Sequence, residues 1–98
     1  MHATVRRLKT QPGKAGEVAE LIRAEYVPLL DSVDGFVSYT LLGLADDEIS
    51  SVGVFESPAA AAEANDLART WTTDRLGPYV AERLEAREAE VLVHAPNT

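Results

Sequence analysis

A small set of side chains in this sequence has the chemistry to hold a flat, electron-rich molecule. Trp71 is the only tryptophan, and Arg6 lies on a predicted strand. An indole can stack on an aromatic ligand, and a guanidinium stays charged and binds a carboxylate or phenolate oxygen through two N–H groups. Each residue also has a structural alternative. Trp71 can simply anchor its helix in the core, and Arg6 can pair with one of the 16 acidic residues.

Other polar and aromatic residues extend this candidate site. Tyr39 and Tyr79 can donate a hydrogen bond into a cavity, or they can pack their rings and leave the hydroxyl at the surface. Asparagine is a poor helix former, so Asn65 within a helix either faces a polar environment or points to solvent. We assign Arg6, Trp71 and Asn65 to catalysis. The side chains assigned to substrate binding are Tyr39, Tyr79, Leu67 and Phe55.

Several chemistries have no support in the sequence. The absence of cysteine excludes thiol catalysis and disulfides. The two histidines, His2 and His94, stand at opposite ends of the chain and form no metal-ligand spacing. There is no glycine-rich phosphate loop and no nucleophile elbow. We therefore expect no metal and no cofactor.

Composition limits the class of protein. A chain of 98 residues forms one domain (1–98), and 46% hydrophobic with 26% charged residues is typical of a globular protein. The net charge of -7 argues against a nucleic-acid partner. No apolar run approaches the ~20 residues that span a bilayer, and the N-terminus has no signal-like pattern. The expectation is a cytoplasmic protein without membrane contact.

The pattern of apolar residues predicts the order strand, helix, strand, strand, helix, strand. The predicted strands are 2–9, 36–44, 49–56 and 88–95. The first helix covers 15–32, and Pro28 should kink or break it. The loop 45–48 is predicted to be a solvated hairpin. Gly77-Pro78 interrupts the second helix, after which a short helical piece should reach about Leu84.

The second helix is the most informative element. Ser57 is its expected N-cap and Pro58 its first residue. An apolar stripe then runs along one face and changes from small alanines at its start to Trp71 at its end. Such a helix lies close to a sheet at one end and away from it at the other. This geometry predicts a cavity beside Trp71.

Two βαβ-like halves predict a ferredoxin-like βαββαβ sandwich, an α+β fold with a four-stranded antiparallel sheet and both helices on one face. Yet the strands carry apolar residues on both faces, which a one-sided sheet would not need. A second copy of the chain is the simplest cover for the open face, so we expect a homodimer. The residues expected there are Val5, Phe36, Leu42, Val52, Val54, Val91 and Val93.

Nearly the whole chain resembles the antibiotic-biosynthesis-monooxygenase-like domains of the dimeric α+β barrel superfamily. The resemblance rests on the Pro12–Lys14 turn, Asp34-Gly35-Phe36, Tyr39, Val54-Phe55-Glu56 and the alanine-rich helix entering at Ser57-Pro58. It implies a homodimer with its sheets face to face and a ligand cavity between helices and sheet in each subunit.

Known members of this superfamily include cofactor-free oxygenases of polycyclic phenols and haem-degrading enzymes. The haem-degrading branch has an asparagine where this chain has Arg6, and a histidine after the helix tryptophan, which is absent here. The polyketide-oxidising branch uses asparagine, tryptophan, tyrosine and arginine; Asn65, Trp71, Tyr79 and Arg87 follow that order with different spacing. Two hypotheses stay open: a cofactor-independent monooxygenase for an aromatic or polyketide-type molecule, or a non-catalytic dimeric ligand-binding or assembly module.

Overall fold

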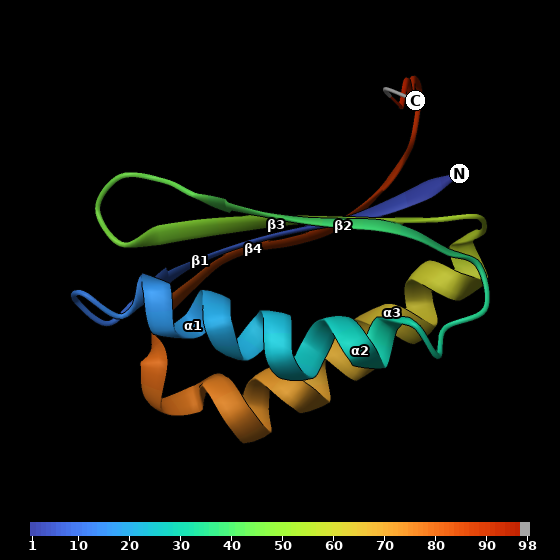
Figure 1. The fold of residues 1–98 in the computed structure, drawn as a ribbon. Coiled ribbons are helices and arrows are strands. Elements are labelled where there is room, and N and C mark those ends of the chain that lie inside the picture. The colour runs from blue at the N-terminus through green and yellow to red at the C-terminus, as the bar shows by residue number, and fades with distance from the viewer. Residues whose placement is uncertain (97–98) are drawn as a thin grey trace.

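The computed structural model describes residues 1–96 as a four-stranded antiparallel sheet covered on one face by two helical segments (Figure 1). The strands, in spatial order β2-β3-β1-β4, are β1 (His2–Thr10), β2 (Phe36–Gly43), β3 (Glu48–Phe55) and β4 (Val80–Glu90). The first helical segment comprises α1 (Ala15–Leu21), η1 (Ile22–Tyr26) and α2 (Val27–Leu30). The second comprises α3 (Pro58–Trp71), η2 (Thr72–Leu76) and η3 (Gly77–Tyr79). The predicted ferredoxin-like α+β fold is confirmed.

Strand register decides which side chains meet the helices. On β1, Arg6 is opposite Ser51 of β3, and Leu8 is opposite Ile49. On β2, Leu41 is opposite the same Ser51. Because side chains alternate along a strand, these residues share the helix-covered face with one another. Arg7 and Val5 consequently lie on the open face.

The first helical segment changes its hydrogen-bond pattern before Pro28 but remains a continuous helix. Residues Ile22–Tyr26 form a π-helical turn, in which the Val27 N–H bonds to the Ile22 carbonyl five residues back. Pro28 has no N–H to give to the Ala24 carbonyl, and a π turn is one way to absorb that loss. The irregularity lies before Pro28, where a disruption was predicted, but it is a π turn and the predicted break does not occur. The segment closes at Gly35, whose φ of +96° only glycine adopts readily.

The second helix begins as predicted. The Ser57 hydroxyl accepts a hydrogen bond from the Ala60 N–H at 3.1 Å, and Pro58 is the first helical residue. Its alanine face is buried, with Ala61 fully inaccessible and Ala64 2% exposed. Small side chains allow this end of the helix to lie close to the sheet.

The C-terminal third of the chain differs from the sequence-based prediction. The short helix to Leu84 and the strand 88–95 are wrong: the single turn η3 begins at Gly77 and ends at Tyr79, and β4 then covers Val80–Glu90. Segment 80–90 is rich in alanine, glutamate and arginine, which favour helix in isolation. Pairing with β1 along its whole length outweighs that local preference. Beyond β4, Leu92 and Val93 are 86% and 85% exposed.

The open face is less apolar than predicted. A register shift between Phe36 and Ser38 places Phe36 opposite Phe55, and the two rings pack with centroids 5.8 Å apart. A bulge of this kind turns a side chain to the other face, so the placement of Phe36 on the open face is wrong. Val54 shares the open face with Val52, as predicted, but it is already buried, at 8% exposure. Leu42 is 47% exposed, and Val5 and Val52 are half-buried. Within residues 1–96, no helix is both long enough and apolar enough to cross a bilayer.

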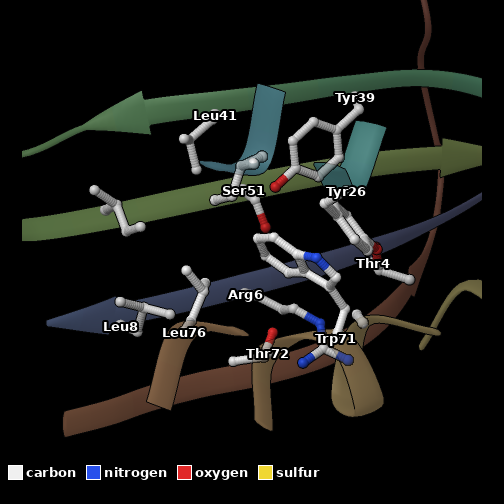
Figure 2. A pocket seen from close by; sticks show the side chains of 13 residues that line it. Thr4, Arg6, Leu8, Tyr26, Tyr39, Leu41, Ser51, Trp71, Thr72 and Leu76 are labelled. Atoms are coloured by element: carbon white, nitrogen blue, oxygen red, sulfur yellow. The ribbon is translucent and has the colours of Figure 1, made fainter. Parts of the chain in front are cut away.

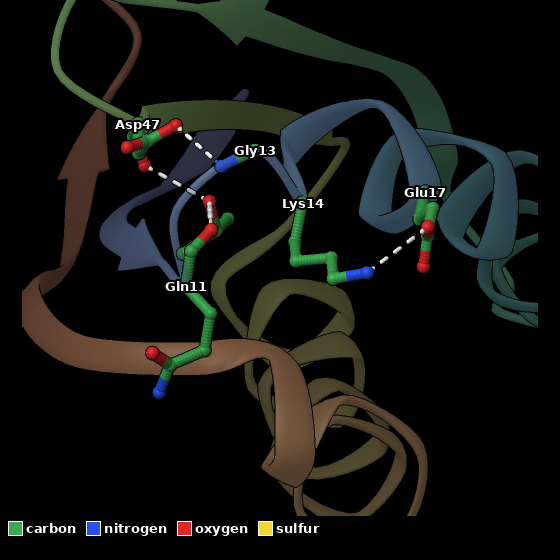
Figure 3. A network of polar contacts seen from close by, with 6 residues as sticks. Gln11, Gly13, Lys14, Glu17 and Asp47 are labelled. Atoms are coloured by element: carbon green, nitrogen blue, oxygen red, sulfur yellow. Dashed lines mark hydrogen bonds and ion pairs between the residues drawn. The ribbon is translucent and has the colours of Figure 1, made fainter.

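The β2–β3 hairpin is not merely solvated, which corrects the prediction for residues 45–48. Asp46 and Asp47 both have φ near +60° (61° and 62°), as a type I′ turn requires. Figure 3 shows Asp47 bound to the turn between β1 and α1. Its carboxylate accepts from the Gly13 N–H at 3.1 Å, and its carbonyl accepts from the Thr10 N–H at 2.8 Å.

Replacing Asp47 by alanine is expected to lower the free energy of unfolding by about 1 kcal/mol more than replacing Asp46 by alanine. Both positions have left-handed backbone, so alanine brings similar strain at each. Only Asp47→Ala removes the hydrogen bond to Gly13. Urea denaturation of the two variants measures the difference. Equal losses would show that the docking of the hairpin tip contributes nothing.

Candidate functional site

A cavity lies between the sheet and the two helical segments, beside Trp71 (Figure 2). Its volume is about 50 Å³, space for a few water molecules. The sheet contributes Thr4, Arg6, Leu8, Tyr39, Leu41, Ile49 and Ser51, and the helical segments contribute Ile22, Tyr26, Ala68, Trp71, Thr72 and Leu76. The predicted cavity beside Trp71 is confirmed, and it arises where the helix stripe changes from alanine to tryptophan.

Three aromatic rings form one wall of the cavity. The Tyr26 and Trp71 ring centroids are 5.3 Å apart, and Tyr26 meets Tyr39 edge-on at 5.5 Å. Burial raises the pKa of Tyr26 to about 12. Burial also raises the pKa of Tyr39. A hydrogen bond with Ser51 lowers that pKa and so offsets part of the rise. Both phenols are therefore protonated at neutral pH, so each can donate a hydrogen bond.

Arg6 reaches into the site from β1 without a carboxylate partner. Its Nη2 donates to the Asn65 side-chain oxygen at 2.9 Å and to the Asn65 backbone carbonyl at 3.4 Å. Among residues 1–96, the ion pairs do not include Arg6. Burial lowers the pKa of Arg6, and the nearby Arg69 and Arg83 lower it further. The Arg6 side chain is thus a partly buried cation held by neutral oxygens. The alternative prediction, a salt bridge between Arg6 and an acidic residue, does not hold within residues 1–96.

Four of the residues assigned from sequence lie outside the cavity lining. Asn65 is on the far side of Arg6 and positions its guanidinium. Phe55 is 1% exposed and packs in the core, and Leu67 is half-buried against that core. Tyr79 follows the end of η2 and faces α1. Arg6, Tyr39 and Trp71 do line the cavity.

Four polar residues of the lining were not assigned from sequence: Thr4, Tyr26, Ser51 and Thr72. Tyr26 follows Ile22 by one turn and precedes Leu30 by another, which is the spacing of a buried helix face and could have identified it. Thr4 shares a strand face with Arg6 and could have been found by alternation. Ser51 is found only through strand pairing, because its place opposite Arg6 depends on the register between β1 and β3.

Residues 1–70 match the model of one protein family, described as antibiotic biosynthesis monooxygenase. The chain belongs to the antibiotic biosynthesis monooxygenase family. The match extends from β1 through α3 and excludes only the last residue of α3, Trp71. It thus includes Arg6, Tyr26, Tyr39 and Ser51 of the cavity lining. No curated protein matches the chain in sequence.

Solved structures share the family fold at low sequence identity. NE2512, a protein of unknown function from Nitrosomonas europaea, has 16% identity and a TM-score of 0.80, over 99% of this chain and 94% of that chain. Rv0793 from Mycobacterium tuberculosis has 19% identity and a TM-score of 0.74, over 97% and 98%. SnoaB, a cofactor-independent oxygenase from Streptomyces nogalater, has 20% identity and a TM-score of 0.70, over 98% and 97%.

In this family member, an ion pair joins the two helical segments next to Trp71. The Glu25 carboxylate accepts two hydrogen bonds from the Arg75 guanidinium, at 2.7 and 2.9 Å. The same carboxylate accepts the indole N–H of Trp71 at 3.4 Å. Glu25 lies in η1 and Arg75 in η2, so the pair bridges two π-helical turns that both contribute cavity residues. Such turns occur often at functional sites, because they interrupt the regular ladder of the helix.

Replacing Glu25 by alanine is expected to expose Trp71, since it removes the contact that joins η1 to η2 at the indole. Acrylamide should then quench the fluorescence of this single tryptophan several times more effectively. Glu20→Ala, which removes an exposed pair with Arg23, is the matched control. Unchanged quenching in Glu25→Ala would show that the pair does not close the site.

The same contact should respond to acid. Hydrogen bonding by Arg75 holds the pKa of Glu25 below its ordinary value. The pair is therefore fully formed above the ordinary carboxylate pKa and is lost as the pH falls through the lowered one.

Proposed function

We propose that this family member is a cofactor-independent monooxygenase that oxidises a phenolic aromatic or polyketide-type small molecule. The observation that carries the proposal is the partly buried guanidinium of Arg6, which has no carboxylate partner within the described chain and faces an aromatic-walled cavity. SnoaB, which has the same fold, is described as a cofactor-independent oxygenase. NE2512 is described as having unknown function, so the fold alone does not decide the activity.

In the proposed reaction, the substrate supplies the electrons and Arg6 supplies the charge that stabilises its anion. The titratable groups in the lining are Arg6 and two neutral tyrosines, so the cavity itself offers no carboxylate or imidazole base. The substrate hydroxyl must ionise on its own, and a fixed cation in a site with little water favours that ionisation. Tyr26 and Tyr39 can donate hydrogen bonds to the same oxygen or to oxygen species formed from it.

The electron count of this reaction closes without a cofactor. The substrate anion reduces dioxygen at an activated ring carbon, and a C–O bond forms to give a hydroperoxide. Loss of water then converts a CH₂ group to a carbonyl. One oxygen atom enters the product and the other leaves as water, so the substrate provides all four electrons.

The size of the cavity requires the site to open before an aromatic substrate binds. A volume of about 50 Å³ is well below the ~300 Å³ of ordinary ligand pockets. Separation of η1 from η2 at the Glu25–Arg75 pair would widen the cavity next to the tryptophan. Closing afterwards would exclude water from the anion.

We propose further that the protein acts as a homodimer in which the open sheet faces meet. The helices cover only one face (Figure 1), and the other carries Leu42, Val5 and Val52 in exposed or half-buried positions. A two-fold pairing would let one surface cover both copies. The cavity lies on the opposite side of the sheet, so each subunit keeps its own site.

Oxygen uptake tests the activity. Purified protein is mixed with hydroxylated anthrones and naphthalenes in an oxygen electrode, with the O-methylated analogues as controls. Uptake that is stoichiometric with product and confined to the free phenols supports a monooxygenase. Saturable binding of the phenols without oxygen uptake supports the alternative, a non-catalytic binding module.

A further inference from the structure

The positive charge of this acidic protein is concentrated in one groove. The groove lies between α3 and the edge strand β4 and has a volume of about 350 Å³. Its lining includes four of the nine basic residues of the chain, and the only acidic side chain there is Glu88. The four are Arg6, Arg69, Arg83 and Arg87. Arg87 is opposite Val5 on β1, so its side chain points to the open sheet face and three guanidinium groups remain on the groove side. A protein with a net charge of -7 has many carboxylates that could have neutralised them, so their grouping needs an explanation.

The groove arginines are poorly neutralised by the protein. Arg69 pairs with Asp66 at 3.4 Å and Arg87 with Glu85 at 3.9 Å, and both arginine side chains are largely exposed. Exposed pairs of this kind contribute little and can be exchanged. Within residues 1–96, Arg6 and Arg83 take part in none of the ion pairs. The like charges also act on one another, since Arg69 and Arg83 help to lower the pKa of Arg6.

Arg6 connects this groove with the aromatic cavity. Its side chain lines both spaces, and its guanidinium lies beside Trp71 in Figure 2. Asn65 fixes the guanidinium from the groove side at 2.9 Å. An anionic group in the groove and an aromatic ring in the cavity would therefore lie on either side of Arg6.

We propose that the groove between α3 and β4 binds a multiply charged oxyanion, a phosphate or polycarboxylate group, carried by the ligand whose ring occupies the cavity. Guanidinium groups match both oxyanions through paired N–H donors. Arg69 and Arg83 act as specificity residues that select an anionic ligand, and Arg6 contacts both of its parts. The inference rests on the proposed function only in assuming that the ligand has an aromatic ring in the cavity. Binding of the oxyanion in the groove needs no turnover.

Calorimetric titration with inorganic pyrophosphate tests the groove by itself, at fixed ionic strength because salt screens such contacts. The wild-type protein should bind pyrophosphate saturably. Arg69→Gln and Arg83→Gln should each weaken binding about tenfold, since each removes charged hydrogen bonds. Arg23→Gln has the same charge change on the other helical segment and should bind as the wild type does. Thermal melting of the three variants verifies that they fold alike.

Titration with tricarballylate, a tricarboxylate, separates the two sources of oxyanion. Tighter binding of pyrophosphate assigns the groove to phosphate groups, and tighter binding of tricarballylate assigns it to carboxylates. The inference is overturned if the wild type binds neither anion saturably, or if all three arginine variants bind equally. Failure of the oxygen-uptake test alone leaves this result unaffected, because anion binding needs no oxidation.

Discussion

Replacing Arg6 by methionine is expected to lower substrate oxidation ~10²- to 10³-fold while leaving the fold at least as stable as before. The guanidinium is partly buried, has neutral oxygen partners and has a lowered pKa, so the folded state holds this charge at a cost. Methionine keeps the unbranched stem that packs along the cavity. Burying a charge without an ionic partner costs free energy, and an apolar side chain of similar size avoids that cost. The free energy of unfolding should stay constant or rise by about 1 kcal/mol.

The effect on activity should be large, because Arg6 is the one cation that residues 1–96 contribute to the lining of the aromatic cavity. Loss of one group that stabilises a developing anion typically lowers turnover ~10²- to 10³-fold. Arg23→Met serves as the control, since Arg23 is exposed and pairs only with Glu20. Oxygen uptake and urea denaturation of both variants give the two readouts. A loss of stability in Arg6→Met with activity retained would assign Arg6 to the fold.

The fold could be predicted well where local signals and packing agree. Ser57-Pro58 caps and starts α3, and the alanine-to-tryptophan stripe placed a cavity beside Trp71. The same agreement holds at Gly35, where a left-handed turn needs glycine. In each case one short stretch of sequence contains the whole physical cause.

Prediction failed where the cause lies in distant segments. Strand β4 has a helix-forming composition and becomes a strand because β1 offers a free edge. Phe36 changes face through a register shift that only its pairing with β3 defines. Asp47 appeared to be a solvated loop residue, yet it binds the β1–α1 turn. These contacts join residues that are far apart in the sequence, so local sequence patterns do not predict them.

The site was predicted in part for the same reason. Arg6, Tyr39 and Trp71 have side chains that can bind a ligand and could be selected by residue type. Ser51 has an ordinary residue type, and only the pairing of β1 with β3 brings it to Arg6. The arginine groove is likewise dispersed in the sequence, with members on β1, α3 and β4.

The second large effect is expected at the open sheet face, where Val52→Asp should convert a dimer into a monomer. Val52 is opposite Val5 on β1 and Thr40 on β2, which places it at the centre of that face. Each apolar side chain covered by a partner contributes ~1.5–3 kcal/mol before ordering costs. A carboxylate there would lose that contribution and would need to be dehydrated in both subunits. The dimer dissociation constant should rise at least ~100-fold.

Sedimentation velocity at micromolar concentration measures the change, and Ala62→Asp on the exposed side of α3 is the control. Aspartate near a helix N-terminus is well tolerated, so this variant should sediment as the wild type does. The segment after β4 bears on the same interface, because it leaves the sheet on the side away from the helices (Figure 1) and exposes Leu92 and Val93. A partner over the open face would cover these side chains. A wild-type chain that sediments at 10.6 kDa would contradict the dimer and leave both features without a function.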